Sequence, residues 1–405
     1  MNRWIRGAQV FGNALAGQPE RVPVLAQMHD HAMFLAGLPA SRFYTDPVAL
    51  IEVELLATEY YDFDVPFLFW DVYNIEAEAI GQKLKFHPRS MPDIDQTTPL
   101  VKNESDLDKV KLLNPGQAGR MPQVLESYAL HLKYSGLPPV LQLCAPFSLA
   151  CGIRSYTGLI SDIKTRPDFA HELLRRICDD VLLPWLKVQY DAVPSTTSVQ
   201  GADAWASPPN VNLRIFEEFV EPYIYRLDEK FANPNCRVGG VAYWGESYLK
   251  NPVDFIEAKV RVSKNTPLGL LCLDPDVERI GVQVPKEVAT KHSVPLILGI
   301  NALLIRSGPI EAIIQRIKEY IAQGAPGGKL GIFLNSLPAD TPPEHIHAAV
   351  AAIRTFGRYP LAKDMDALEV KIPPRESFAE FVRRKQQDNP EGYTFSWLDE
   401  AHLKE

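Results

Sequence analysis

The sequence predicts an α/β fold, specifically a (β/α)8 barrel of the TIM type, and two observations carry this prediction. Eight short apolar runs rich in Val, Ile, Leu and Phe recur along the 405 residues, and a longer segment with helical periodicity follows each run. The last four runs begin at residues 237, 267, 295 and 329, which is the spacing of β-α-β repeats. Apolar runs separated by helical crossovers favour a closed barrel of parallel strands over an open sheet, which would need edge strands.

Each run is assigned as a strand because several apolar residues stand together between turn-forming residues. In chain order the predicted strands are Val22–Met28, Pro66–Val72, Pro139–Ala145, Ser198–Trp205, Arg237–Tyr243, Pro267–Asp274, Pro295–Asn301 and Lys329–Ser336. Two of the crossover helices are especially clear. One helical face comprises Ile310, Ile313, Ile314, Ile317 and Ile321, and another comprises Ile346, Ala349, Val350 and Ile353.

Residues 1–360 are therefore predicted to form the barrel. The long interval between the second and third strands, residues 73–137, contains turns rich in Pro and Gly and one extra helix, so it is predicted to be an insertion or lid. Residues 361–405 form a C-terminal tail with a short polar helix at Glu376–Gln386. We expect this tail to dock either on the barrel or on a partner subunit.

Composition excludes several classes of protein. With 46% hydrophobic and 23% charged residues, the chain can bury a large core. Its 42 basic and 50 acidic residues give a net charge of −8, and no run of Lys or Arg forms a basic stripe, which argues against nucleic acid as a partner. No stretch approaches the ~18 uninterrupted apolar residues of a membrane span. The N-terminus lacks a signal-peptide pattern, and five scattered cysteines fit a reducing compartment, so we expect a cytoplasmic protein without membrane contact.

The active site of such a barrel forms at the carboxyl ends of the strands, so polar residues that end the runs are the candidates. Those predicted to be catalytic are Asp71, His29, His31 and Asp203. Those predicted to bind substrate are Trp70, Tyr73, Gln142, Trp205, Tyr243, Trp244, Asn301 and Asn335. Five of these eight are aromatic, which suits a flat small-molecule substrate.

Several of these residues have a second interpretation. His29 and His31 at a strand end would place both imidazoles on one side, where they and Glu246 could hold a metal, with zinc as the candidate. Alternatively, one ring faces the pocket and the other caps the next helix. Asp71 is either a functional carboxylate or the N-cap of the following turn, and Asp203 is either functional or a structural hydrogen-bonding group.

At several ordered stretches the chain resembles the uroporphyrinogen decarboxylase superfamily, which includes cobalamin-dependent methyltransferases. The stretches are Ala14–Val24, Phe67–Asp71, Cys144–Leu149, Asp203–Ala206, Phe216–Tyr223, Pro295–Asn301 and Asp340–Ile346. The resemblance implies the same barrel, and it matches Asp71 to the catalytic aspartate of the family. It also implies a homodimer.

The same resemblance shows where this chain departs from its relatives. The decarboxylases carry arginines after the first strand, whereas this chain has Gln27–Phe34 there without an arginine. The methyltransferases that this chain resembles share a zinc site formed by one histidine and two cysteines. The corresponding positions in this chain are Ala242, Trp244 and Asn335. The zinc site of that type is therefore absent, which leaves the alternative set formed by the two histidines and Glu246.

Three functions remain open. The first is a corrinoid-dependent methyltransferase subunit that demethylates a small, aromatic O-methyl substrate, with the cobalamin carried by a separate corrinoid protein because the chain lacks a DxHxxG segment. The second is a decarboxylase or other lyase that uses Asp71 and the histidines as acid and base without a metal. The third is a binding or scaffold protein on a barrel that has lost both catalytic sets.

Overall fold

The computed structural model describes residues 2–68 and 71–404, which belong to two compact units. Unit 1 comprises residues 1–69, 130–137 and 270–405, and unit 2 comprises residues 70–129 and 138–269. Each unit is described by itself. In the described ranges, none of the helices is both long enough and apolar enough to cross a lipid bilayer.

Unit 1 is built on a four-stranded parallel sheet. Its strands lie in the order β1 (Val24–Ala26), β9 (Leu330–Leu334), β8 (Leu296–Ile300) and β7 (Leu270–Leu273). Every residue of β1, β8 and β9 is buried, as expected of parallel strands that are covered on both faces. The carboxyl ends of the four strands therefore lie along one edge of this sheet.

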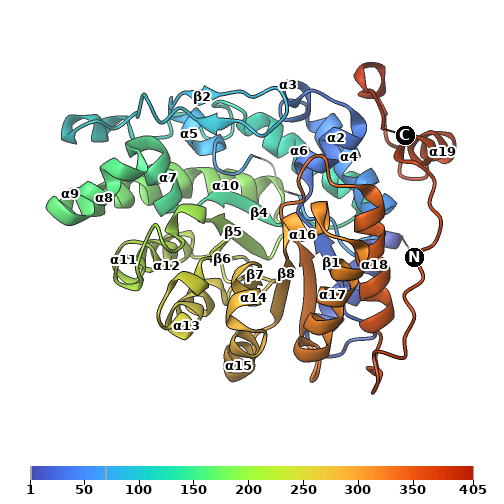
Figure 1. Cartoon of the computed structure of the whole chain (residues 1–405). Helices are drawn as coiled ribbons and strands as arrows, with labels where there is room; N and C mark the ends of the chain where they lie inside the picture. Colours follow the sequence, from blue (N-terminus) through green and yellow to red (C-terminus); the bar gives the residue numbers. More distant parts are fainter. Residues whose placement is uncertain (1, 69–70, 405) are drawn as a thin grey trace. The chain divides into compact units, whose positions relative to one another are not determined.

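The helices of unit 1 present apolar faces that periodicity predicted correctly. Figure 1 shows α17 (Ile310–Gly324) and α18 (Pro343–Phe356) side by side, and the two helices pack on each other. Ile313, Ile317 and Ile321 of α17 are completely buried. The other helices of the unit are α1 (Arg3–Leu15), α2 (His29–Ala36), α3 (Ala40–Phe43), α4 (Pro47–Tyr60), α14 (Asp276–Ile280), α15 (Gln283–His292), α16 (Ala302–Ser307), α19 (Phe378–Asp388) and η5 (Leu398–Glu400).

The C-terminal tail packs on helix α4 of its own chain. The polar helix predicted at Glu376–Gln386 is found as α19, two residues further along. Beyond it, the buried carboxylate of Glu52 accepts hydrogen bonds from the backbone N–H of Phe395 at 2.9 Å and from the indole of Trp397 at 3.0 Å. Because Trp397 is completely buried, the tail is part of the core of unit 1.

Unit 2 is built on a second parallel sheet, in the order β4 (Leu141–Cys144), β5 (Ser198–Ala202) and β6 (Arg237–Val241). A short antiparallel hairpin joins β2 (Leu84–Lys85) to β3 (Asp93–Ile94). Its helices are α5 (Ile75–Ala79), η1 (Glu104–Lys109), the first part of α6 (Met121–Ser135), α7 (Pro146–Arg154), α8 (Tyr156–Thr165), α9 (Pro167–Arg176), η2 (Ile177–Leu182), α10 (Leu183–Ala192), η3 (Ala204–Ala206), α11 (Leu213–Phe219), α12 (Glu221–Phe231), η4 (Glu246–Tyr248) and α13 (Pro252–Ser263).

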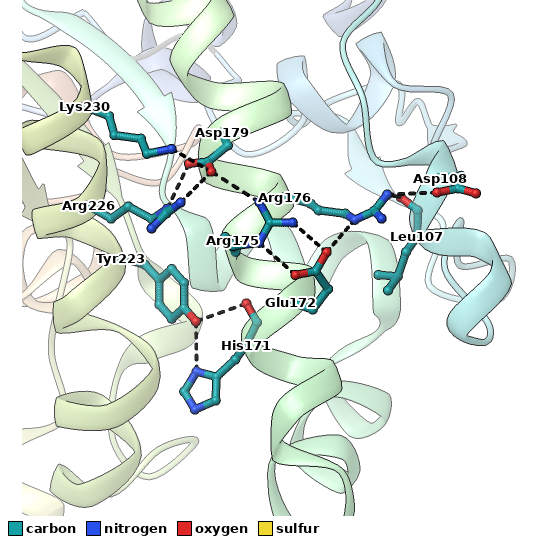
Figure 2. Close-up of polar contacts among 10 residues, drawn as sticks. All are labelled: Leu107, Asp108, His171, Glu172, Arg175, Arg176, Asp179, Tyr223, Arg226 and Lys230. Carbon is teal, nitrogen blue, oxygen red and sulfur yellow. Dashed lines mark hydrogen bonds and ion pairs between the residues drawn. The ribbon is translucent and has the colours of Figure 1, made fainter.

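A network of charged side chains joins the outer helices of unit 2. Asp179 lies on η2, a π-helical turn between α9 and α10, and it accepts hydrogen bonds from Arg226 and Lys230 of α12, both at 2.8 Å. Figure 2 shows that Arg175 is also directed toward Asp179 and that Arg176 extends to Asp108 of η1. Each cation of this network has a carboxylate partner, so the network holds the helices together.

The α/β fold with parallel strands agrees with the prediction from sequence. The second predicted strand, however, is not found in the described residues of its run. The run Pro66–Val72 forms no strand at 66–68 or 71–72, and residues 69–70 lie outside the described residues. Asp71 instead begins a turn, in which its carbonyl oxygen accepts a hydrogen bond from the N–H of Asn74 at 3.1 Å. The remaining seven runs each contain a strand that is shorter than predicted.

Candidate functional site

In unit 2, the carboxyl end of β5 positions a buried carboxyl group, that of Asp203. Its Oδ1 accepts a hydrogen bond from the backbone N–H of Ser148 at 2.9 Å, and its Oδ2 accepts one from the hydroxyl of Tyr243 at 3.3 Å. Burial raises the pKa of Asp203 to about 7, although the hydrogen bonds from Ser148 and Tyr243 oppose that rise. Asp203 therefore exchanges a proton near neutral pH.

Asp71 is a second buried carboxyl group of unit 2, and an arginine holds it. The guanidinium of Arg120 donates to Oδ2 at 2.5 Å and also to Glu78 at 2.7 Å. Asn74 is the N-cap residue of α5 and donates its side-chain amide to Asp71, so Asp71 does not take the alternative role of N-cap of this helix. Burial raises the pKa of Asp71 to about 7, against the effect of Arg120.

Glu76 is a third buried acid, and sequence analysis missed it. Its Oε1 accepts a hydrogen bond from the backbone N–H of Cys144, at the end of β4, at 3.2 Å. Burial raises the pKa of Glu76 to about 8, and the negative charge of Asp71 adds to the rise. Glu76 lies in the short acidic helix α5, whose sequence resembles a solvent-exposed turn, so only its position after Asp71 could have pointed to it.

Two indole rings lie exposed beside the ends of β5 and β6. The exposed fraction is 37% for Trp205 and 40% for Trp244. Trp205 stacks on Tyr156 with ring centroids 5.4 Å apart, and its backbone N–H donates to the hydroxyl of Ser148, the residue that also contacts Asp203. Ser148 therefore connects the exposed Trp205 to the buried carboxyl group of Asp203, whereas the backbone N–H of Trp244 donates to the hydroxyl of Ser207 at 3.1 Å.

The other residues predicted to bind substrate in unit 2 differ in exposure. Tyr243 is buried against Phe216, so it positions Asp203 rather than offering a stacking surface. Tyr73 is partly exposed, and Gln142 is buried on β4. Trp70 lies outside the described residues.

The predicted pair of histidines lies on a helix rather than at a strand end. Strand β1 ends at Ala26 and α2 begins at His29, and residues two apart on a helix do not share a face. The ring of His31 uses both nitrogens, since Nε2 contacts the Tyr61 hydroxyl at 2.7 Å and Nδ1 contacts the carbonyl of Ala339 at 3.0 Å. Burial lowers the pKa of His31 to about 4, so it is a neutral histidine of the core.

The residues of the predicted metal set belong to different units, His29 and His31 to unit 1 and Glu246 to unit 2. His29 is buried, which lowers its pKa, and its ring meets that of Tyr44 edge-on at 6.3 Å. In unit 2, Glu246 is completely buried and paired with the ammonium group of Lys259. The part of the chain that the structure describes holds no group of three or more His, Cys, Asp or Glu side chains arranged for a metal ion.

The two predicted asparagines of unit 1 lie at the ends of β8 and β9. The side-chain oxygen of Asn301 caps α16 by accepting from the N–H of Leu303 at 2.9 Å, so this oxygen is committed to the helix. Asn335 is partly exposed and accepts a long hydrogen bond of 3.4 Å from Ser336. Asp274, at the end of β7, is held by Arg316 and Tyr320 of α17 and has a structural role.

Comparisons with known proteins agree with the resemblance predicted from sequence. The family model described as "Uroporphyrinogen decarboxylase (URO-D)" matches residues 8–356. A protein named "Methylated-thiol--coenzyme M methyltransferase" from Methanosarcina mazei is 26% identical over 232 residues, which cover 56% of this chain and 60% of that relative. The match thus spans less than two thirds of the relative.

A solved structure described as a methyltransferase from Methanosarcina mazei has the same fold. It superimposes with a TM-score of 0.68 at 18% sequence identity and covers 87% of this chain and 98% of its own. At this level of identity the likeness concerns the fold, so the chemistry must be argued from the residues of unit 2.

Proposed function

Because the chain belongs to the uroporphyrinogen decarboxylase family, we propose that it is a methyltransferase that demethylates a small aromatic O-methyl compound. The observation that carries the proposal is Asp203, a buried carboxyl group with a pKa of about 7, whose hydrogen-bond partner Ser148 also binds the backbone N–H of the exposed Trp205. Such a group can protonate a leaving oxygen at neutral pH. The relative from Methanosarcina mazei is named as a methyltransferase, which supports the same class of reaction.

The reaction divides into a methyl transfer and a proton transfer. The bond between the methyl carbon and the ether oxygen breaks, the methyl carbon forms a bond to the acceptor, and the oxygen keeps the electron pair. Asp203 gives its proton to that oxygen, so the product leaves as a phenol. The backbone N–H of Ser148 and the hydroxyl of Tyr243 then stabilise the aspartate that remains.

The substrate ring is proposed to stack on Trp205 and Trp244, whose exposed indoles present flat apolar faces. Stacking fixes the plane of the ring and thereby the direction of the ether oxygen. Asp71, fixed by Arg120 and Asn74, is proposed to bind a polar substituent of the same substrate.

The residues of this chain do not suit a zinc ion, and we propose that the corrinoid is carried by another protein. Ala242 and Trp244, at two of the three positions of the zinc site in related methyltransferases, have no group that binds zinc, and His31 has both nitrogens engaged. No step therefore uses zinc. A corrinoid, when bound, supplies the nucleophile that accepts the methyl group. We place it on a separate protein, because this chain has no DxHxxG segment.

The test is a methyl-transfer assay under anaerobic conditions with a methoxylated benzoate as donor and free reduced cobalamin as acceptor. Absorbance reports the formation of methylcobalamin. We expect the unsubstituted protein to transfer methyl groups and the Asp203→Asn variant to be slower by about 10² to 10⁴-fold. Leu113→Ala serves as the control, since Leu113 is an exposed apolar residue of unit 2 outside the site.

The buried carboxyl groups also suit the alternative of a decarboxylase or lyase that works without a metal, because Asp71 and Asp203 both exchange protons near pH 7. A lyase turns over without an acceptor. Release of carbon dioxide from a carboxylated substrate in the absence of cobalamin, together with no methyl transfer, would replace the proposed function by this alternative.

A further inference from the structure

Unit 1 contains a cleft of about 500 Å³. None of the candidate site residues predicted from the sequence lines it. It is lined by Arg3, Glu59, Tyr60, Asp62, Pro374, Arg375, Glu376, Phe381 and Arg384. Residues 374–384 lie beyond the part of the chain that the family model matches, residues 8–356. The C-terminal tail therefore builds one side of this cleft, and α1 and α4 build the other.

The three acids of the cleft each contact a cation, and the cation beside Glu59, Lys385, is shared with Glu391. Glu59 pairs with Lys385 at 3.1 Å, and Glu376 receives the guanidinium of Arg384, whose Nε lies 3.2 Å away. Asp62 pairs with Arg3 at 3.5 Å. The negative charges that line the cleft are thus screened by partners within the protein.

The cation that remains is Arg375. Within the described residues its guanidinium has no ionic or hydrogen-bonding partner, although it faces the cleft. Burial and the charge of Glu376 raise the pKa of the Tyr60 hydroxyl, whereas the charge of Arg375, an exposed residue that lines the same cleft, opposes this rise. Arg3 also lines the cleft, but its guanidinium is held by Asp62 and by the carbonyl of Phe63 at 3.3 Å.

Two of the residues that line the cleft, Tyr60 and Phe381, are aromatic. The ring centroids of Tyr60 and Phe381 lie 5.5 Å apart, and the hydroxyl of Tyr60 is fixed by a hydrogen bond of 3.0 Å to the carbonyl of Glu376. A volume of this size is typical of sites for small organic molecules. An unpaired guanidinium is a planar fork that matches a carboxylate by two parallel hydrogen bonds.

We propose that this cleft binds a small organic carboxylate, with Arg375 on the carboxylate and the aromatic residues Tyr60 and Phe381 beside the organic body. The site is separate in sequence from the carboxyl groups of unit 2, and it does not depend on the proposed methyl transfer. Because the tail supplies Arg375, a bound carboxylate would also hold the tail against α1 and α4.

The test is isothermal titration calorimetry of the full-length chain with benzoate, compared with neutral benzamide and with inorganic phosphate. We expect benzoate to bind, benzamide not to bind, and phosphate to bind more weakly than benzoate. In the Arg375→Ala variant the affinity for benzoate should fall at least about tenfold, as expected for loss of a charge-assisted pair. Arg383→Ala is the matched control, since Arg383 is an exposed arginine of the same tail, on α19, that does not line the cleft.

Two further variants make the result decisive. Asp203→Asn alters the candidate site of unit 2 and should leave benzoate affinity unchanged, whereas loss of binding there would place the benzoate in unit 2 and overturn the proposal. Arg375→Lys keeps the charge without the planar fork and should bind with intermediate affinity. Equal binding by Arg375→Ala and the unsubstituted chain, equal binding of benzamide, or no binding of benzoate would each overturn it.

Discussion

Replacing Asp203 by asparagine should make the protein more stable at alkaline pH while removing its proposed catalytic acid. The substitution keeps the shape of the side chain and its hydrogen bonds. The asparagine oxygen can accept from the N–H of Ser148, and the amide can donate to the hydroxyl oxygen of Tyr243, which both contact Asp203 in the structure. The principal change is therefore the loss of an ionisable group at a position that is completely buried.

The size of the effect follows from the pKa of Asp203, which burial raises from its ordinary value of 3.8 to about 7. The carboxyl group ionises in the unfolded chain at a lower pH than in the folded chain. Its contribution to the stability of the folded state is therefore fully present below about pH 4 and is lost as the pH rises to about 7. Each pH unit in that window lowers the free energy of unfolding by about 1.4 kcal/mol. Between about pH 5 and about pH 8 the loss is therefore about 3 kcal/mol, and Asp203→Asn does not suffer it.

The assay is urea unfolding of both proteins at about pH 5 and about pH 8, followed by tryptophan fluorescence. We compare the free energy of unfolding of the variant with that of the unsubstituted protein at each pH. In this difference, the contributions of all ionisable groups that the two proteins share cancel. We expect this difference to move in favour of the variant by about 3 kcal/mol at the higher pH. A difference that is the same at both pH values would refute the reasoning, because Asp203 would then ionise alike in the folded and unfolded chain.

Four further outcomes are expected. The rate of methyl transfer should fall about tenfold per pH unit above about pH 7 in a pH–rate profile, because the protonated form of Asp203 is the acid. Trp244→Ala should raise KM up to about tenfold, as one lost stacking contact implies, whereas Leu113→Ala should not. Arg120→Met should lower the free energy of unfolding by about 3 kcal/mol at about pH 8 and by less at about pH 5, where its carboxyl partner is protonated; urea unfolding at both values measures this. His31→Ala should lower the free energy of unfolding by about 2 kcal/mol without changing metal content measured by mass spectrometry.

The position of Asp203 at the carboxyl end of a strand could be predicted from sequence, but the partners of Asp71 and Asp203 could not. The apolar run that ends at Asp203 contains β5, whereas the run around Asp71 forms no strand in its described residues, and Asp71 begins a turn. Arg120 is 49 residues from Asp71 in a segment without regular pattern, and nothing in the local sequence indicates that they meet. Contacts of this kind depend on how a long loop packs, which periodicity does not encode.

The failure of the histidine prediction has a local cause. A pair of residues two apart shares one face on a strand and diverges on a helix, so the prediction depended on where β1 ends. The apolar run continues to Met28, but the ladder with β9 stops at Ala26, opposite Leu334. Helix α2 then starts at His29, and His31 turns into the core against Tyr61. An error of two residues at a strand end thus changed the assigned role of both histidines.

The raised pKa of Asp203 explains how a member of this family could transfer a methyl group without zinc. In a zinc site the metal polarises the leaving atom, whereas an exposed aspartate with a pKa of 3.8 carries a proton in only about one molecule in a thousand at pH 7. Burial at the end of β5 raises that fraction to about half. The protonated fraction at pH 7 is therefore several hundredfold larger than for an exposed aspartate. The desolvation that causes this increase also destabilises the folded chain at alkaline pH. Asp71 has a similar pKa, but its charge is held by Arg120, so the aspartate next to neutral donors, Asp203, is the better acid of the two.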